Sequence, residues 1–328
     1  MKRLLNGSLR MAAAGLLFGA AQLLPAQAIA QDDYPSQTIH FICAFPPGSG
    51  ADVLVRYFAD KVSKVAGQTV VVENKPGAMS NIAAEYTVRA KPDGYTMFVH
   101  SGNSIAGNMH ILKNPPFDVA KDLRTVATIN KQAFMITVRK DSPYQNLQQL
   151  TEAMKEKGEN GSYAVNATSG RVLAEQYKQL AGLDTVAVQY KSSADSLNDM
   201  MSGAVDFGAH DPVFALGQIR EGRWRALAIG SGERMKGVPD VPTFKEQGIN
   251  IDQLGWWGVM VPAGTPDEIA NKINGWFNEV LAQPDTQKFL ADQGGDPFVS
   301  TPEEAQALME RTVEEWETLV EIAQIPQQ

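Results

Sequence analysis

Four short segments of this 328-residue sequence have the composition of loops that bind small anions. Each is rich in Gly, Ser, Thr or Asn and follows an apolar run: Phe45–Asp52, His100–Ser104, Asn166–Gly170 and Tyr190–Ser193. Where a strand leads into a helix, the first helical N–H groups lack intrahelical partners and the helix dipole is positive. Glycine lets the backbone approach a ligand, and hydroxyls add donors. The segments therefore predict anion-binding loops, although turns and helix caps that bind nothing use the same residues.

Arg171 directly follows the third segment, close to the predicted start of a helix. A cation there is opposed by the helix dipole, so the position favours a role other than helix stability. A guanidinium can hold a carboxylate through two parallel hydrogen bonds, which makes Arg171 a candidate ligand contact. His210 and Asp211 follow another apolar run and could line the same site. A surface arginine and a structural His–Asp pair are the alternatives.

Motifs of common enzymes do not match this sequence. It contains no Gly-x-Ser-x-Gly motif and no Walker loop, and Val53 stands where a dinucleotide-binding fingerprint needs glycine. The four histidines are never four residues apart, and the one cysteine, Cys43, cannot complete a zinc pattern. We therefore predict that the protein is not an enzyme and uses no cofactor and no metal. A serine hydrolase acting through Ser49 or Ser169 is the less favoured alternative, because triad residues meet only in the fold.

The first thirty residues have the pattern of a cleaved export signal. A basic start and an apolar run, Met11–Leu24, precede two overlapping triplets of the form small-x-small within Ala26–Ala30. The run is shorter than the roughly 20 apolar residues that a membrane-spanning helix needs. We predict cleavage near Ala30, a mature chain that begins near Gln31, and a periplasmic location.

The sequence is acidic, with a formal net charge of −8. Without the three basic residues of the predicted signal, 26 basic residues stand against 37 acidic ones, which gives a net charge of −11. A surface this acidic argues against nucleic acid or an anionic membrane as a partner. Any anionic ligand must therefore be attracted by local groups.

Apolar runs of strand length alternate with amphipathic helical stretches, which indicates an α/β fold. The predicted strands are apolar on both faces, as in a parallel sheet covered by helices: Thr38–Ala44, Thr69–Glu73, Tyr95–His100, Phe134–Arg139, Ser162–Asn166, Thr185–Tyr190, Val205–Ala209 and Ala226–Gly230. The helices predicted between them are Ala51–Val65, Ser80–Arg89, Asn146–Lys157, Arg171–Leu180, Ser193–Met201 and Val213–Glu221. Two later helices are expected to be capped by Thr265 and Thr301, each followed by Pro and then by Glu.

So many strands favour two α/β lobes over a single sheet. After a signal peptide at 1–30, we assign lobe 1 to 31–132 plus 253–328 and lobe 2 to 133–252. The chain would then cross between the lobes near Lys131–Phe134 and near Asp252–Gly255.

The sequence resembles the solute receptors of tripartite tricarboxylate transporters, the Bug family of periplasmic binding proteins. Seven motifs in order carry the resemblance: Tyr34-Pro35 with Ile39–Gly48, Val70–Gly77, Lys91–Thr96, Tyr190-Lys191, Gly222–Ala228, Asp240–Thr243 and Trp256–Pro266. It implies a two-lobed type II periplasmic-binding fold whose ligand cleft closes by hinge motion, as in a Venus flytrap. It also implies a small organic carboxylate as ligand and the membrane subunits of a tripartite transporter as partner, with a sensor kinase as the alternative partner.

The resemblance also implies positions for the ligand contacts. Together with the residues singled out above, they make up the predicted site: Phe45, Gly48, Ser49, Asp52, Ser101, Asn103, Asn166, Thr168, Ser169, Arg171, Ser193, His210 and Asp211.

Three departures from the family pattern bear on the ligand. Ala51 lacks the hydroxyl usual in the first loop, the loop before Arg171 is shorter, and His210 stands where many members have Asp. Compared with the family pattern, the predicted site has His210 in place of an acid and also has Arg171. This change favours a ligand with a second anionic group over a ligand with an ammonium group. We predict a dicarboxylate, with aromatic diacids included, bound by a monomeric receptor.

Overall fold

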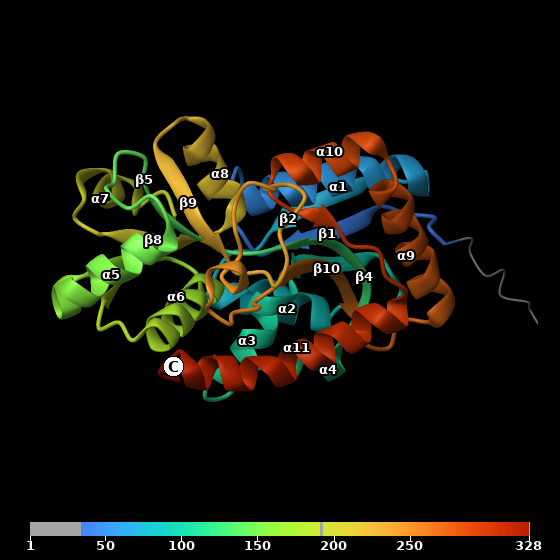
Figure 1. Ribbon diagram of the computed structural model, residues 1–328. Helices are drawn as coiled ribbons and strands as arrows, with labels where there is room; N and C mark the ends of the chain where they lie inside the picture. The colour runs from blue at the N-terminus through green and yellow to red at the C-terminus, as the bar shows by residue number, and fades with distance from the viewer. Residues whose placement is uncertain (1–33, 191–192, 328) are drawn as a thin grey trace, which may run out of the picture. The chain divides into compact units, whose positions relative to one another are not determined.

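The strands of the protein form two sheets, each with its own helices (Figure 1). The computed structural model describes residues 34–190 and 193–327, and Pro35–Gln328 forms one compact unit. The predicted signal peptide, Lys191 and Ser192 lie outside the described residues. The predicted α/β fold is confirmed.

The first sheet has the strand order β11-β4-β10-β3-β1-β2. Its strands β1, β2 and β3 run parallel, whereas β10 runs antiparallel to both β3 and β4. In Figure 1, α1 and α10 lie on one side of this sheet and α3 and α11 on the other. The bounds are β1 Ile39–Cys43, β2 Val70–Asn74, β3 Thr96–Ser101, β4 Leu123–Gln132, β10 Gly255–Pro262 and β11 Asp296–Pro297.

The second sheet has the order β7-β6-β8-β5-β9. Strands β7, β6 and β8 are parallel, and β5 is antiparallel to its two neighbours. The carboxyl ends of the parallel strands therefore share one edge in each sheet. The bounds are β5 Met135–Arg139, β6 Ser162–Val165, β7 Val186–Gln189, β8 Phe207–His210 and β9 Trp224–Ile229.

Helices connect most of these strands. Their apolar faces pack on the sheets, and their bounds are α1 Gly50–Ala66, α2 Asn81–Val88, α3 Gly102–Ile111, α4 Val119–Asp122, α5 Leu147–Lys157, α6 Thr168–Ala181, α7 Leu197–Ser202, α8 Pro212–Arg220, α9 Asp267–Leu281, α10 Pro284–Asp292 and α11 Pro302–Ile322. Three short 3₁₀ turns are η1 Ala78–Ser80, η2 Gly158–Asn160 and η3 Lys245–Gln247.

All eight predicted strands occur, but the expectation of parallel sheets is only partly right. Strands β5 and β10 run antiparallel in the middle of their sheets. Both are buried on two faces, so their composition does not differ from that of a parallel strand. The strand prediction did not include β4, in which polar residues alternate irregularly with apolar ones, nor β10 and the two-residue β11.

One of the two predicted helix caps is confirmed. Thr301 accepts from the Glu304 N–H while the Glu304 carboxylate accepts from the Thr301 N–H, which completes a capping box. The prediction for Thr265 was wrong. Its hydroxyl donates to the Pro262 carbonyl at 2.7 Å, and α9 begins one residue later, after Pro266.

The chain passes between the sheets twice, after Gln132 and before Gly255. Hydrogen bonds tie the two passages together: the Gly230 N–H donates to the Phe134 carbonyl at 2.9 Å, and the Gln253 N–H donates to the Gly230 carbonyl at 2.7 Å. The division into two lobes, with its crossing points near Lys131–Phe134 and near Asp252–Gly255, stays a prediction.

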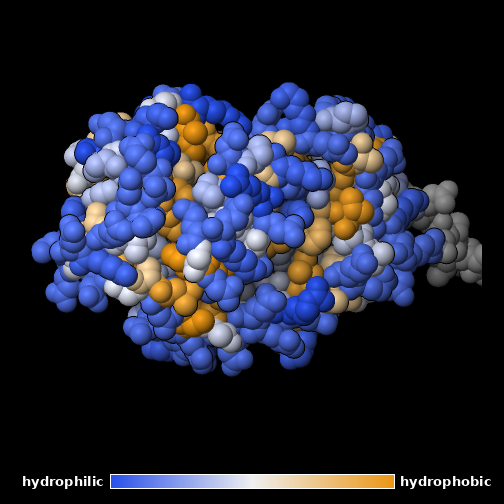
Figure 2. Space-filling view, in the orientation of Figure 1, coloured by the Kyte–Doolittle hydropathy of each residue, from blue (hydrophilic) through white to orange (hydrophobic). Residues whose placement is uncertain are grey.

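The face of the molecule drawn in Figure 2 is mostly hydrophilic, with hydrophobic residues in separate bands. Within residues 34–190 and 193–327, none of the helices combines the length and apolar character needed to span a bilayer. Apolar side chains of the described residues form buried clusters, among them one on the first sheet and one on the second.

His210 is a polar residue inside the second sheet, fully buried beside Trp224. Its Nδ1 lies 2.9 Å from the Thr137 hydroxyl and its Nε2 lies 3.0 Å from the Ser196 hydroxyl. Burial lowers the pKa of His210 to about 3, so the ring is neutral at physiological pH. The residue therefore belongs to the core.

We expect His210 to make stability depend on pH. Since its ordinary pKa is 6.5 and its folded pKa is about 3, the unfolded chain binds an extra proton between these values. The contribution of the neutral His210 ring to the free energy of unfolding is complete above pH 6.5. It decreases as the pH falls, by up to roughly 1.4 kcal/mol per pH unit. Urea unfolding at several pH values from 7 to 4 measures this effect. At pH 7 the His210→Leu variant should have a free energy of unfolding about 1–3 kcal/mol lower than that of the wild type. Its free energy of unfolding should also fall less steeply than that of the wild type as the pH is lowered. A slope equal to that of the wild type would contradict this assignment.

Candidate functional site

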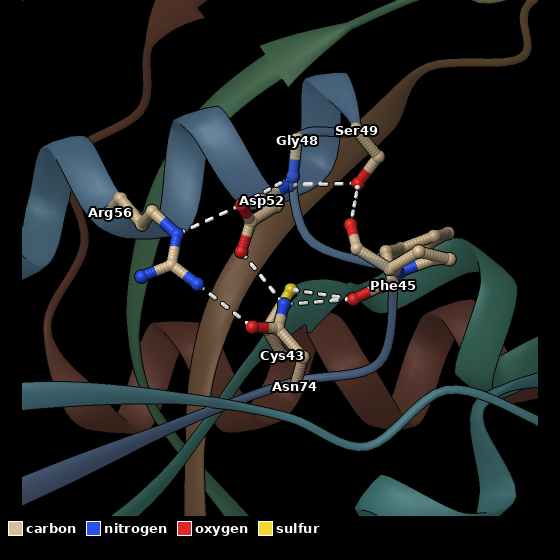
Figure 3. Close-up of polar contacts among 8 residues, drawn as sticks. Cys43, Phe45, Gly48, Ser49, Asp52, Arg56 and Asn74 are labelled. Carbon is tan, nitrogen blue, oxygen red and sulfur yellow. Dashed lines mark hydrogen bonds and ion pairs between the residues drawn. The ribbon is translucent and has the colours of Figure 1, made fainter.

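The first predicted loop, between β1 and α1, is stabilised by hydrogen bonds to one buried carboxylate, that of Asp52. Asp52, which is 1 % exposed, accepts hydrogen bonds from the Gly48 N–H at 2.8 Å and from Arg56 Nε at 2.8 Å. Asn74, at the end of β2, donates from its amide to Asp52 at 2.7 Å and to the Phe45 carbonyl at 2.9 Å. Figure 3 shows these groups converging beneath the loop. The loop conformation is thus fixed before any ligand binds.

The charge of Asp52 is maintained despite its burial. Burial, the largest influence, raises its pKa, but the hydrogen bonds from Arg56, Asn74 and the Gly48 N–H together bring the pKa below the ordinary value. All these hydrogen-bond donors to the Asp52 carboxylate belong to the protein itself. The structure therefore makes Asp52 a residue that positions the loop, and its predicted contact with ligand stays a prediction.

The loop presents the start of α1. Ser49 caps the helix by accepting from the Asp52 N–H at 3.2 Å, and its hydroxyl donates to the Pro46 carbonyl at 2.8 Å. Gly48 has a φ of 81°, a left-handed conformation that glycine adopts without strain. The Gly50 and Ala51 N–H groups, as the first of the helix, have no acceptor within it.

The second predicted loop, after β3, is held by hydrogen bonds within the protein, and its predicted contacts with ligand stay predictions. Ser101 caps α3 by accepting from the Ser104 N–H at 3.4 Å. Asn103 is buried, and its amide donates to the Leu254 carbonyl at 3.2 Å while its oxygen accepts from the Trp256 N–H at 3.2 Å. Asn103 therefore joins the start of α3 to the chain passage that leads into β10.

The start of α6 has free hydrogen-bonding capacity. Its N-cap is Ala167, whose methyl side chain cannot accept a hydrogen bond, and Thr168, Ser169 and Gly170 form the first turn. Arg171 follows, and its Nε is buried with no hydrogen-bond partner among the described residues. Arg171 therefore stands within one turn of the helix start, where the helix dipole is positive.

Three predicted residues of the second sheet form one hydrogen-bonded group. The Ser193 hydroxyl lies 3.0 Å from the Asn166 side-chain oxygen and 2.9 Å from the Asp211 carboxylate. Asp211 also caps α8 by accepting from the Phe214 N–H at 2.9 Å. Removal from water, the largest influence, raises the pKa of Asp211 above its ordinary value. These residues order the carboxyl ends of β6 and β8.

His210 and Ser196 form a serine–histidine contact of the kind that the hydrolase alternative needs, but it is poorly suited to that chemistry. Both residues are fully buried, and the second ring nitrogen faces the Thr137 hydroxyl and not a carboxylate. A ring with a pKa of about 3 is also a weak base. Both ring nitrogens are occupied within the protein, so the predicted contact between His210 and ligand stays a prediction.

The binding edges of the two sheets meet. A Cβ built on Gly50, the first residue of α1, would lie only 3.0 Å from Val213 Cγ1 in α8. The Gln253 side chain, from the passage before β10, donates to the Ser169 carbonyl at 3.0 Å. The predicted residues of both sheets are therefore brought toward one another.

Two surface hollows lie away from these loops. One, of about 330 Å³, borders the chain passages and is lined in part by Lys131, Asp252 and Leu254. The other, of about 800 Å³, runs along α2 beside Lys75 and Tyr86. The ligand cleft implied by the resemblance stays a prediction.

Two mixed α/β sheets with helix starts gathered at facing strand ends are the architecture of a solute-binding protein. Residues 54–325 match the tripartite tricarboxylate transporter family receptor, and the chain belongs to that family. Protein BugT of Bordetella pertussis is 28% identical to it over 320 residues, which cover 96% of this chain and 98% of BugT. The predicted family is confirmed.

Solved structures agree with this assignment. The chain is similar to R. palustris Rpa4515 with adipate, with 26% identity, a TM-score of 0.81 and coverage of 90% of this chain and 99% of the other. It is also similar to MatC (Rpa3494) from Rhodopseudomonas palustris with bound malate, with 26% identity, a TM-score of 0.75 and coverage of 88% and 100%. Receptors of this family are periplasmic binding proteins.

The support of the first loop by Asp52 can be tested by removing its charge. In Asp52→Asn one oxygen becomes an amide that faces a donor, so we expect the free energy of unfolding to fall by about 2–3 kcal/mol. Urea unfolding at pH 7 measures the change. Asp60→Asn, an exposed carboxylate on the same helix, is the control and should change stability by less than about 0.5 kcal/mol. Equal effects of the two variants would show that Asp52 does not support the loop.

Proposed function

We propose that this protein is a periplasmic receptor that binds a small organic dicarboxylate, aromatic diacids included, and delivers it to the membrane subunits of a tripartite tricarboxylate transporter. It acts without chemistry on the ligand. The observation that carries the proposal is the start of α6, which has no side-chain cap and whose first turn includes Arg171, with a buried Nε that has no partner among residues 34–190 and 193–327.

The start of α6 suits a carboxylate better than other ligands. A carboxylate is planar and accepts hydrogen bonds only, so it can use helix N–H groups and a guanidinium together. A buried donor without a partner costs about 1–3 kcal/mol, and binding an anion would recover that cost. A cationic ligand would be repelled by the same groups.

The first loop suits a second carboxylate. The start of α1 offers the Gly50 and Ala51 N–H groups. Because the Asp52 carboxylate accepts a hydrogen bond from the loop and holds it in place, binding would carry little cost for ordering the loop. Because α1 and α6 belong to different sheets, a diacid would bridge them. The diacids adipate and malate named in the similar structures support this choice of ligand class.

The ligand would also drive closure. If the two sheets separate in the free receptor, a diacid that contacts both binds the closed form more tightly and shifts the population toward it. The closed form would then be recognised by the transporter subunits. Export to the periplasm follows from the basic, apolar and small-residue pattern of the first thirty residues.

A thermal-shift screen of the chain from Gln31 onward tests the ligand class. Binding to the folded state alone adds about 2.7 kcal/mol of stability at one hundred times the dissociation constant. We expect adipate, malate or an aromatic diacid to raise the melting temperature, and the corresponding diamides to leave it unchanged. A shift with neutral or cationic solutes and none with diacids would refute the proposal.

Arg171→Gln tests the assigned contact. A hydrogen bond to a charged group contributes about 1.5–3 kcal/mol, so the dissociation constant of a bound diacid should rise at least ~10-fold. Calorimetric titration measures it. The control is Lys178→Gln, which removes one positive charge from the last turn of the same helix. If both variants bind as the wild type does, Arg171 is a surface residue without a role in binding.

A further inference from the structure

His100 is the buried polar side chain that the fold explains least. It stands near the carboxyl end of β3, directly before the cap of α3, and its side chain has no exposed surface. Neither ring nitrogen has a hydrogen-bond partner among the residues that the structure describes. A ring in this position normally has a partner for each nitrogen, because burial removes it from water.

The other three histidines show what a satisfied ring looks like in this protein, and all of them are described. His210 is equally buried but faces two hydroxyls, at 2.9 and 3.0 Å. His40 lies 2.6 Å from the Glu73 carboxylate, and His110 lies 2.7 Å from the Val313 carbonyl. Burial alone therefore does not account for the unpaired nitrogens of His100.

Aromatic side chains surround the ring. The ring centroids of Phe98, Phe45 and Trp257 lie 4.8, 5.3 and 5.7 Å from that of His100. This apolar environment lowers the pKa of His100 to about 3, so the ring is neutral and offers one N–H donor and one lone pair. A formal charge on a ligand group would be poorly solvated here.

The position of His100 connects it to the ligand loops. Phe45 belongs to the first loop and is half-buried, whereas Phe98 and Trp257 are buried. Of the three aromatic rings around His100, Phe45 is therefore the one that reaches the surface, and it contacts the imidazole from the first loop.

We propose that His100 binds an uncharged hydroxyl group of the captured carboxylate, which takes the place of the Phe45 ring, and that it selects hydroxy acids over acids that lack the hydroxyl. The inference rests on the proposed function. A hydroxyl donates and accepts, which matches a neutral imidazole, while the carboxylates remain at the helix starts. A site that hydrogen-bonds a ligand hydroxyl rejects the analogue without it, because the site's own polar group is then left unpaired.

Pairs of acids that differ by one hydroxyl test the inference. Calorimetric titrations would compare malate with succinate, 3-hydroxyadipate with adipate, and 4-hydroxyphthalate with phthalate. We expect the wild type to bind the hydroxy acid of at least one pair 10-fold or more tightly. His100→Leu should abolish this preference, and His100→Gln, which keeps a donor and an acceptor, should retain part of it. The control His40→Gln, at the other end of the same sheet, should leave the preference unchanged.

Stability separates a binding role from a structural one. If His100 serves the ligand, His100→Leu removes two unpaired nitrogens and should leave the urea midpoint of the free protein unchanged or higher. A preference that survives in His100→Leu, or a wild type that binds diacids with no preference in any pair, overturns the inference and leaves the proposed function intact. Failure of the wild type to bind any of these six acids overturns both.

Discussion

The arrangement of the binding groups depends on how the chain crosses between the two sheets. At the crossing, Gly230 donates to the Phe134 carbonyl and accepts from the Gln253 N–H, so three separate segments are joined by backbone bonds. A Cβ on Gly230 would lie 3.0 Å from Leu173 Cδ1 of α6, which leaves little room for any other residue. The Gln253 side chain then binds the Ser169 carbonyl in the first turn of α6. The crossing therefore sets the position of one helix start relative to the first sheet.

The two principal helix starts are prepared in different ways. In the first loop, Asp52, Asn74 and Arg56 satisfy one another, so the loop is held by bonds within the protein and the proposed ligand would meet backbone N–H groups already in place. At the start of α6, Ala167 provides no cap and Arg171 Nε has no partner among the described residues, so favourable bonds remain to be made. A preorganised surface lowers the entropic cost of ordering the protein on binding. A surface with unpaired hydrogen-bonding groups gains free energy when a ligand pairs them. Because the whole chain is acidic, an anionic ligand has to be attracted by such local groups and not by the overall charge of the protein.

Periodicity and composition predicted eight of the strands, most of the helices between them and the loops after β1, β3 and β6, because these signals are local. The direction of β5 and β10 was not predictable in this way, since a strand buried on both faces has the same composition in either direction. Residue type also does not reveal how His210 and Asp211 are held in the fold, and their contacts with ligand stay predictions. The hydrogen bonds of His210 with Ser196 and of Asp211 with Ser193 come from a segment that only the fold brings close to them.

His100 illustrates the opposite case. It opened one of the predicted segments but was not proposed as a contact, because nothing in the sequence distinguishes a paired from an unpaired imidazole. An unpaired buried group alone is weak evidence, since Thr185 and Trp224 also have one such atom. What separates His100 and Arg171 from these is position: each stands beside a helix start at the carboxyl end of a parallel strand, where backbone donors are already unpaired. In such a place a missing partner is best supplied by a ligand.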